Sequence, residues 1–253
     1  MSAYEALAGS YDALTQDVPY EAILDYVEAL LARHGRQPET VLDLACGTGS
    51  LAALLAQKGY RVLAADASED MLAMAYDKAQ ALELPNPPFF ICQRMEQLTL
   101  PEPVDLVVCT LDSLNYLTDP QDARRALGRI YEALKPGGAV IFDINTPEKL
   151  RGLDGQVFLD EDEDTYCVWR AEFDEAENIC YYGMDLFQRR GRLWQRSFEE
   201  HREYAYAPEE LETYLREAGF QTVCRYGDRS LEPPAPGAQR IYFYGEKQSP
   251  EGA

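Results

Sequence analysis

The sequence predicts a single α/β domain built on a doubly wound, mostly parallel sheet of seven strands. Between residues 40 and 144, five apolar, strand-like segments alternate with helical segments, and this alternation is typical of a parallel sheet. A small-residue turn containing Gly47 and Gly49 directly follows the first of these strands and opens a helix, which is typical of a ligand-binding α/β sheet. Over residues 151–206 the pattern changes to long strand-like segments with little helix, so we expect an antiparallel insertion in the same domain.

The chain is expected to begin with an N-terminal helical cap over residues 1–35. Residues 2–14 place Tyr4, Leu7 and Tyr11 at helical spacing, and a longer apolar face follows over 22–34. Gly35 then provides a suitable C-cap.

The parallel part of the sheet follows in strict alternation with helices. The expected strands are 40–45, 61–65, 89–92, 104–109 and 139–144, and the expected helices are 51–57, 68–82 and 121–134. Ser68 is a suitable N-cap for the second of these helices, and Asp119 or Thr118 for the third. The Lys-Pro-Gly-Gly sequence at 135–138 is a strong stop and turn signal before the last strand.

The insertion at 151–206 is predicted to be an antiparallel β lid over the carboxyl edge of the sheet. Its strands are expected at 166–173, 179–188 and 192–206, with turns at 174–178 and 190–191. A helix at 208–218, with Pro208 at its start and Gly219 past its end, leads to two closing strands at 220–226 and 240–245. No linker separates two cores, so residues 1–253 form one domain.

Composition excludes several classes of partner. The net charge of −21 repels nucleic acid and anionic membranes, and no apolar run is long enough to span a bilayer. The first 15 residues carry no basic residue and do not resemble a signal peptide. The six scattered cysteines and two histidines favour buried thiols in a reducing compartment over disulfides or zinc. We therefore expect a cytoplasmic protein without a metal, with no DNA and no membrane partner, as a monomer or homodimer.

Two carboxylates near the glycine turn identify the kind of ligand expected there. Asp66 ends the second strand about 20 residues after the turn, where an acid suits two ribose hydroxyls. Asp43, four residues before Gly47, would repel a dinucleotide pyrophosphate and attract a cation. S-adenosylmethionine (SAM) offers a sulfonium, an ammonium and a ribose diol. The alternative is a tight turn that binds no ligand.

The sequence Asp-x-Ala-Cys-Gly-Thr-Gly at 43–49 resembles the first motif of the class I SAM-dependent methyltransferases, which have a Rossmann-like fold. The resemblance implies that Gly47 and Gly49 underlie the methionine part of SAM and that Asp66 takes the ribose hydroxyls. The family usually places an aspartate and an apolar residue after the third strand, to read the adenine. Here Arg94 stands at the position of that aspartate and Met95 follows it, while Gln93 is a possible substitute for the missing acid.

The segment after the fourth strand, Thr110-Leu111-Asp112-Ser113, lies where family members line the methyl-transfer site. The sequence of this segment, and the pattern Tyr4-x6-Tyr11-Asp12, resemble those of a subgroup of small bacterial methyltransferases that act on small molecules. By this resemblance Tyr11 closes over the methionine end of SAM; the alternative is that it only packs its helix. The implied cofactor-binding residues are Tyr11, Asp43, Ala45, Gly47, Gly49, Asp66, Ala67, Met71, Gln93, Arg94, Met95, Thr110 and Asp112.

These residues favour a SAM-dependent methyltransferase that acts on nitrogen or oxygen of a small-molecule acceptor by in-line displacement. Tyr11 and His201 are the catalytic candidates; His201 can serve as a base if it faces the site, and otherwise is a surface strand residue. The insertion would form the acceptor pocket, a dimer contact or both. Protein or RNA methylation and a non-catalytic SAM-binding regulator remain alternatives, and a nicotinamide dehydrogenase ranks last because of Asp43.

Overall fold

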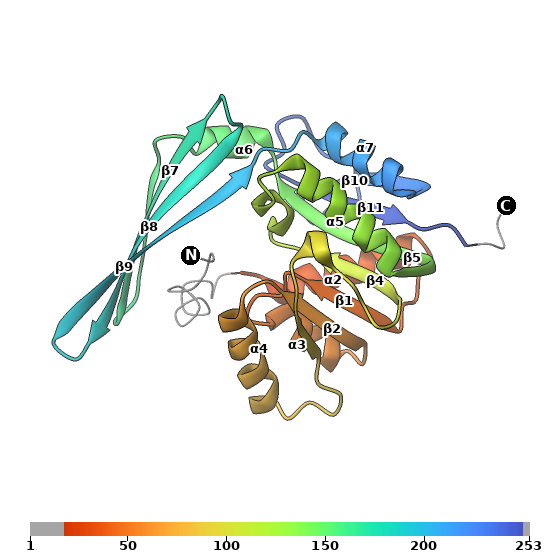
Figure 1. Ribbon diagram of the computed structural model, residues 1–253, viewed down its shortest axis with the longest axis horizontal. Helices are drawn as coiled ribbons and strands as arrows, with labels where there is room; N and C mark the ends of the chain where they lie inside the picture. The colour runs from red at the N-terminus through yellow and green to blue at the C-terminus, as the bar shows by residue number, and fades with distance from the viewer. Residues whose placement is uncertain (1–17, 250–253) are drawn as a thin grey trace.

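The computed structural model describes residues 18–249, and a seven-stranded sheet forms its centre (Figure 1). In spatial order the strands are β10 (Thr222–Gly227), β11 (Arg240–Glu246), β5 (Leu134–Asn145), β4 (Val104–Cys109), β1 (Thr40–Leu44), β2 (Arg61–Asp66) and β3 (Phe89–Cys92). Strand β11 runs antiparallel to the other six strands, which are parallel to one another. The predicted doubly wound, mostly parallel sheet of seven strands is confirmed.

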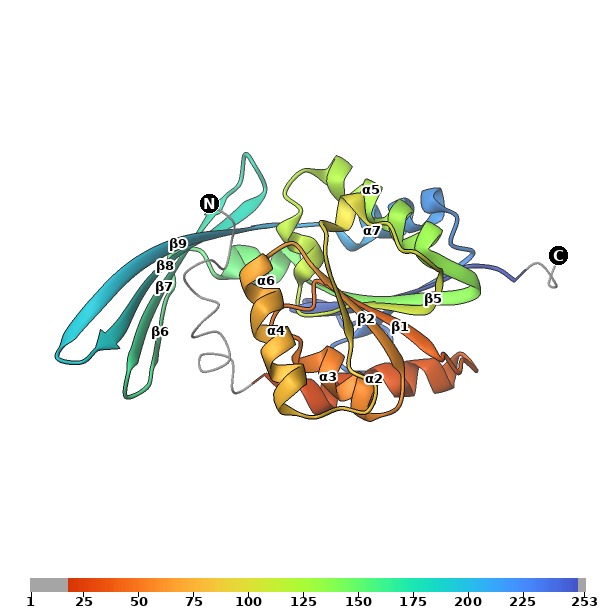
Figure 2. The same ribbon diagram turned by 60° about the horizontal axis from the view of Figure 1, so that its bottom comes forward.

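Helices cover both faces of this sheet. They are α2 (Tyr20–Arg33), α3 (Ser50–Gln57), α4 (Glu69–Ala81), α5 (Pro120–Ala133), α6 (Pro147–Gly152) and α7 (Pro208–Ala218), with short 3₁₀ helices η1 (Met95–Gln97) and η2 (Ser113–Tyr116). In Figure 2, α5 and α7 lie on one face and α2, α3 and α4 on the other. Phe142 and Ile141, neighbours on β5, are both fully buried and belong to the two opposite apolar clusters. Burial on both faces explains the continuous apolar runs of the central strands.

Local capping fixes several helix boundaries close to where the sequence predicts them. The Ser68 side chain accepts a hydrogen bond from the Met71 amide, and the Asp119 side chain accepts one from the Gln121 amide. Gly219 ends α7 at a φ of 113°, a conformation that favours glycine.

The strand β5 begins five residues earlier than predicted. The turn predicted at 135–138 is instead part of this strand, because its backbone bonds to the chain just past β11. The Gly137 amide donates to the Lys247 carbonyl, and the Lys247 amide donates to the Gly138 carbonyl, each at 2.9 Å. A register shift against β4 accommodates the change.

The insertion forms a second, antiparallel sheet of four strands. These are β6 (Val157–Glu161), β7 (Thr165–Asp174), β8 (Ile179–Arg190) and β9 (Leu193–Tyr204). The last three strands agree with the sequence prediction, whereas β6 was not predicted, because every residue of β6 is exposed and no apolar alternation marks it. The short helix α6 was also missed.

The second sheet leaves the main sheet at its carboxyl edge. It follows β5 through α6 and returns through β9 to α7, and it projects away from the α/β core (Figures 1 and 2). The buried Asn115 of η2 joins the two sheets, because its side-chain amide donates to the carbonyls of Asn145 at 3.1 Å and Tyr204 at 2.9 Å. The base of the second sheet is thereby fixed beside the ends of β4 and β5.

Two expectations fall on the start of the chain. The predicted helix at 2–14 and Tyr11 lie outside the described residues, whereas the second helix of the predicted cap is α2. Within residues 18–249, no helix combines the length and apolar character needed to cross a membrane.

Candidate active site

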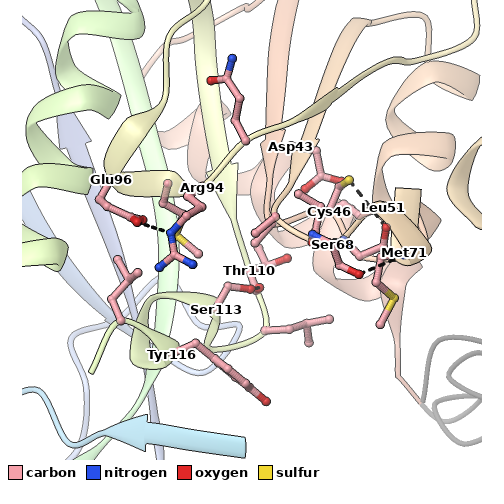
Figure 3. Close-up of a pocket in the computed structure, with 18 of the residues that line it drawn as sticks. Asp43, Cys46, Leu51, Ser68, Met71, Arg94, Glu96, Thr110, Ser113 and Tyr116 are labelled. Atoms are coloured by element: carbon pink, nitrogen blue, oxygen red, sulfur yellow. Dashed lines mark hydrogen bonds and ion pairs between the residues drawn. The ribbon is translucent and has the colours of Figure 1, made fainter. Parts of the chain in front are cut away.

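One cavity of about 440 Å³ lies at the carboxyl edge of the parallel strands (Figure 3). Its volume falls in the range of small-molecule sites. Its walls come from the segments after β1, β2, β3 and β4 and from the start of α2. The lining residues are Tyr20, Asp43, Ala45, Cys46, Gly47, Leu51, Asp66, Ala67, Ser68, Met71, Gln93, Arg94, Met95, Glu96, Thr110, Leu111, Ser113, Tyr116 and Leu117.

The glycine turn shapes one wall through left-handed backbone conformations. Ala45, Gly47 and Gly49 have φ angles of 59°, 53° and 74°. A Cβ atom on Gly47 would meet nothing within 4 Å, whereas one on Gly49 would lie 2.9 Å from the Cβ atom of Ala75 in α4. Gly49 does not line the cavity. It permits the turn and the close approach of α4 behind it.

Asp43 presents a buried carboxylate to the cavity. It lies on β1 at 2 % exposure, and its Oδ2 atom has no hydrogen-bond partner among residues 18–249. Burial, and to a smaller extent the nearby Asp66 carboxylate, raise the pKa of Asp43 to about 8. A carboxylate in this position favours a cationic ligand, because the positive charge would supply a counter-charge to an oxygen that has no partner in the described part of the chain.

Asp66 lies at the end of β2 and is held by backbone amides. Its Oδ2 atom accepts from the Gly47 amide at 2.9 Å, and its Oδ1 atom accepts from the Ser68 amide at 2.8 Å. Burial raises its pKa, and these hydrogen bonds oppose the shift. Each oxygen has capacity for a second donor, so the carboxylate can also accept from two hydroxyls.

The segment after β3 contributes a charged pair. The side chain of Gln93 is engaged at both ends by the Thr99 backbone, at 3.2 and 2.9 Å. Arg94 extends from the next position, and its Nε donates to the Glu96 carboxylate on η1. Figure 3 shows this pair on the opposite side of the cavity from Cys46 and Ser68.

The turn after β4 is fixed by an ion-pair network that the sequence analysis did not find. The buried Asp143 on β5 accepts from the amides of Leu111 at 2.7 Å and Asp112 at 3.1 Å, and it pairs with Arg240 on β11. The carboxylate of Asp112 lies 2.5 Å from the same guanidinium. Thr110 lines the cavity, and Asp112 instead belongs to this network.

An aromatic cluster connects the cavity with the second sheet. Tyr116 lines the cavity and makes an edge contact with the His201 ring, with centroids 5.9 Å apart. His201 on β9 is 1 % exposed and also lies 6.1 Å from the Trp169 ring. Its Nε2 atom is 3.3 Å from a carboxylate oxygen of Glu199. Of the two positions considered for His201, the structure shows the buried one, next to a cavity residue.

The structure thus brings most of the predicted site residues into one cavity. Those that line it are Asp43, Ala45, Gly47, Asp66, Ala67, Met71, Gln93, Arg94, Met95 and Thr110. Gly49, Asp112 and His201 do not line it, and Tyr11 lies outside the described residues. The lining residues absent from the predicted set are Tyr20, Cys46, Leu51, Ser68, Glu96, Leu111, Ser113, Tyr116 and Leu117. Most of these residues are next to a predicted site residue in the sequence, whereas no sequence motif identifies Tyr20 as a site residue.

Comparisons with known proteins agree with this geometry. A family model described as a methyltransferase domain matches residues 41–138. The chain is 32% identical over 246 residues to a putative methyltransferase, YqeM, of Bacillus subtilis (strain 168), covering 96% of this chain and 97% of that protein. It is 27% identical over 231 residues to a glycine/sarcosine N-methyltransferase of Parasynechococcus marenigrum (strain WH8102), covering 85% of this chain and 74% of that enzyme.

A solved structure extends the match to the whole chain. The SAM-dependent methyltransferase from Clostridium acetobutylicum ATCC 824 aligns with a TM-score of 0.86 and 30% identity, over 98% of this chain and 100% of that one. The similarity in sequence and in fold therefore extends over nearly the whole chain. The chain belongs to the class I SAM-dependent methyltransferases.

Proposed function

We propose that this enzyme transfers a methyl group from SAM to a nitrogen or oxygen of a small-molecule acceptor, with nitrogen favoured. The observation that carries the proposal is a single cavity lined by both the buried carboxylate of Asp43 and the aromatic ring of Tyr116. The glycine/sarcosine N-methyltransferase among its relatives supports a nitrogen acceptor.

The proposed placement of SAM follows the order of the strands. Its cationic end meets Asp43 at β1, its ribose hydroxyls meet Asp66 at β2, and its adenine reaches β3, because these strands are adjacent in this order. The unpartnered Oδ2 of Asp43 and the open space above Gly47 are the features that fit this ligand. Ala45, Ala67, Met71, Arg94, Met95 and Thr110 complete the proposed binding site. When bound, SAM supplies an electrophilic methyl group on a positively charged sulfur.

The acceptor is proposed to enter on the Tyr116 side, under the second sheet. The Tyr116 ring lines the cavity there and can shield a cationic amine, and it packs on His201, which in turn packs on Trp169. Holding the acceptor atom in line with the methyl group supplies ~7–11 kcal/mol of the barrier reduction. The insertion would thus act as a lid that selects the acceptor.

His201 has a role only if the acceptor must lose a proton. A neutral amine attacks directly, whereas a hydroxyl requires a base. Glu199, 3.3 Å from the His201 Nε2 atom, would orient the ring. We therefore propose His201 as the base for a hydroxyl acceptor and as a packing residue for an amine.

The rival functions are distinguishable. An RNA acceptor is disfavoured because a chain of net charge −21 would repel it. A protein acceptor would show itself by turnover with peptides alone. A non-catalytic regulator would bind SAM without transferring its methyl group to any acceptor.

Titration calorimetry with SAM, S-adenosylhomocysteine (SAH) and NADH is the first test. We expect micromolar binding of the two sulfur compounds, none of NADH, and loss of binding in Asp66→Ala but not in Glu102→Gln, an exposed carboxylate between β3 and β4. A screen of small amines and alcohols, followed by SAH formation, then identifies the acceptor class. Binding of NADH, or unchanged SAM affinity in Asp66→Ala, would overturn the proposed site; turnover with peptides or RNA alone would overturn the acceptor class.

A further inference from the structure

The segment after β3 lacks the acid that the family uses to read adenine, but the cavity has a carboxylate two residues later. Glu96 lies on η1, its side chain is 7 % exposed, and it lines the same cavity as Asp43 and Asp66. Glu96 is therefore both buried and part of the cavity wall.

Only one oxygen of Glu96 is satisfied by the protein. Arg94 Nε donates to Oε1, while Oε2 is fully buried and has no hydrogen-bond partner within residues 18–249. A buried carboxylate oxygen without a donor is costly, so its retention beside a ligand cavity points to a donor on the ligand. Gln93, the other candidate acceptor nearby, has both ends of its amide on Thr99.

We propose that Glu96 Oε2 accepts a hydrogen bond from the 6-amino group of the SAM adenine, and that Arg94 is the positioning residue that holds the carboxylate. The inference rests on the proposed placement of SAM, in which the cationic end and the ribose occupy Asp43 and Asp66. The adenine then lies at β3, the next strand in the sheet, where Met95 also lines the cavity. In the family the acid directly precedes the apolar residue. Here Arg94 takes that position, and the acid, Glu96, follows Met95 and is held by Arg94.

The test exchanges the 6-amino donor for an acceptor. SAH and its 6-oxo analogue, S-inosyl-L-homocysteine, are titrated into the whole protein by calorimetry. The wild type is expected to prefer SAH by ~10–100-fold, the effect of a hydrogen bond to a charged group and of the repulsion that replaces it. In Glu96→Gln the side-chain amide can donate to the 6-oxo group, so the preference falls to about threefold or reverses.

Two further variants separate position from charge. Glu102→Gln removes an exposed carboxylate from the same connection and is expected to keep the wild-type preference. Arg94→Gln removes the partner of Glu96 but leaves its carboxylate, so it keeps the sign of the preference and reduces its size.

The outcomes distinguish this inference from the function on which it rests. If the wild type binds both nucleosides equally, or Glu96→Gln keeps the full preference, the role of Glu96 is wrong and the SAM site stands. If the wild type binds neither compound, the proposed SAM site fails and the inference fails with it.

Discussion

At the scale of single residues, Asp43 links ligand binding to protonation. Its pKa of about 8 in the ligand-free protein means that it is mostly protonated at pH 7, because burial and Asp66 disfavour the charge. A cation placed beside it stabilises the carboxylate and lowers that pKa. Binding of SAM at pH 7 should therefore release a proton from Asp43.

The expected result follows from the sign of this shift. SAM affinity rises with pH up to about 8 and then levels off, since above that pH Asp43 is already charged in the free protein. Calorimetry in two buffers of different ionisation enthalpy should show close to one more proton released by the wild type at pH 7 than by Asp43→Asn. In Asp43→Asn, SAM affinity should also lack the part of its pH dependence that comes from Asp43. The amino group of SAM titrates equally with the wild type and with the variant, so it cancels in the comparison. Equal proton release would show that Asp43 does not meet the cation.

His201 gives a second prediction at this scale. His201→Asn removes the ring base but keeps a polar side chain of smaller size next to Tyr116 and Trp169. With a hydroxyl acceptor kcat should fall ~10²–10⁴-fold, because general base catalysis contributes this amount. With an amine acceptor at a pH where the amine is neutral, kcat should change little. A large loss with amines as well would assign His201 to positioning.

At the scale of elements, the turn between β1 and α3 gives a matched pair of substitutions. Gly47 and Gly49 both have positive φ, so alanine strains each by ~1–2 kcal/mol. Only at Gly49 does the new Cβ collide with Ala75, which adds ~1–3 kcal/mol of overpacking. Gly49→Ala should therefore melt roughly 2–12 °C below Gly47→Ala in thermal unfolding followed by circular dichroism. Equal melting temperatures would mean that α4 moves aside without cost.

The elements also show what can be predicted from sequence and what cannot. The strand, glycine turn and helix around Asp43 could be predicted because residues close in sequence determine them. The Asp143–Arg240 pair could not, since it depends on the register of β5 and β11, which are separated by the whole insertion. The strand β6 carries no apolar alternation, so pairing with β7 alone defines it. The position of Glu96 relative to the cavity likewise depends on the 3₁₀ turn of η1, which no motif marks.

At the scale of the whole molecule, the charge of −21 should affect how the two sulfur ligands arrive. At neutral pH SAM carries a net positive charge, because its sulfonium and ammonium outweigh its carboxylate, whereas SAH is neutral overall. An acidic protein attracts the first and not the second at long range, and salt weakens this attraction as the screening length falls from ~10 Å at 0.1 M to ~3 Å at 1 M.

Stopped-flow measurement of tryptophan fluorescence can follow both ligands, because the Trp169 ring lies 6.1 Å from that of His201, which contacts the cavity residue Tyr116. The association rate of SAM should fall at least ~3-fold between low and high salt, while that of SAH changes less than ~2-fold. Asp43→Asn should weaken SAM binding mainly through faster dissociation and keep nearly the same salt dependence of association, because one buried group contributes little to the long-range field. Identical salt dependence for SAM and SAH would instead show that the acidic surface does not steer the ligand, and that the preference for a cation arises only at Asp43.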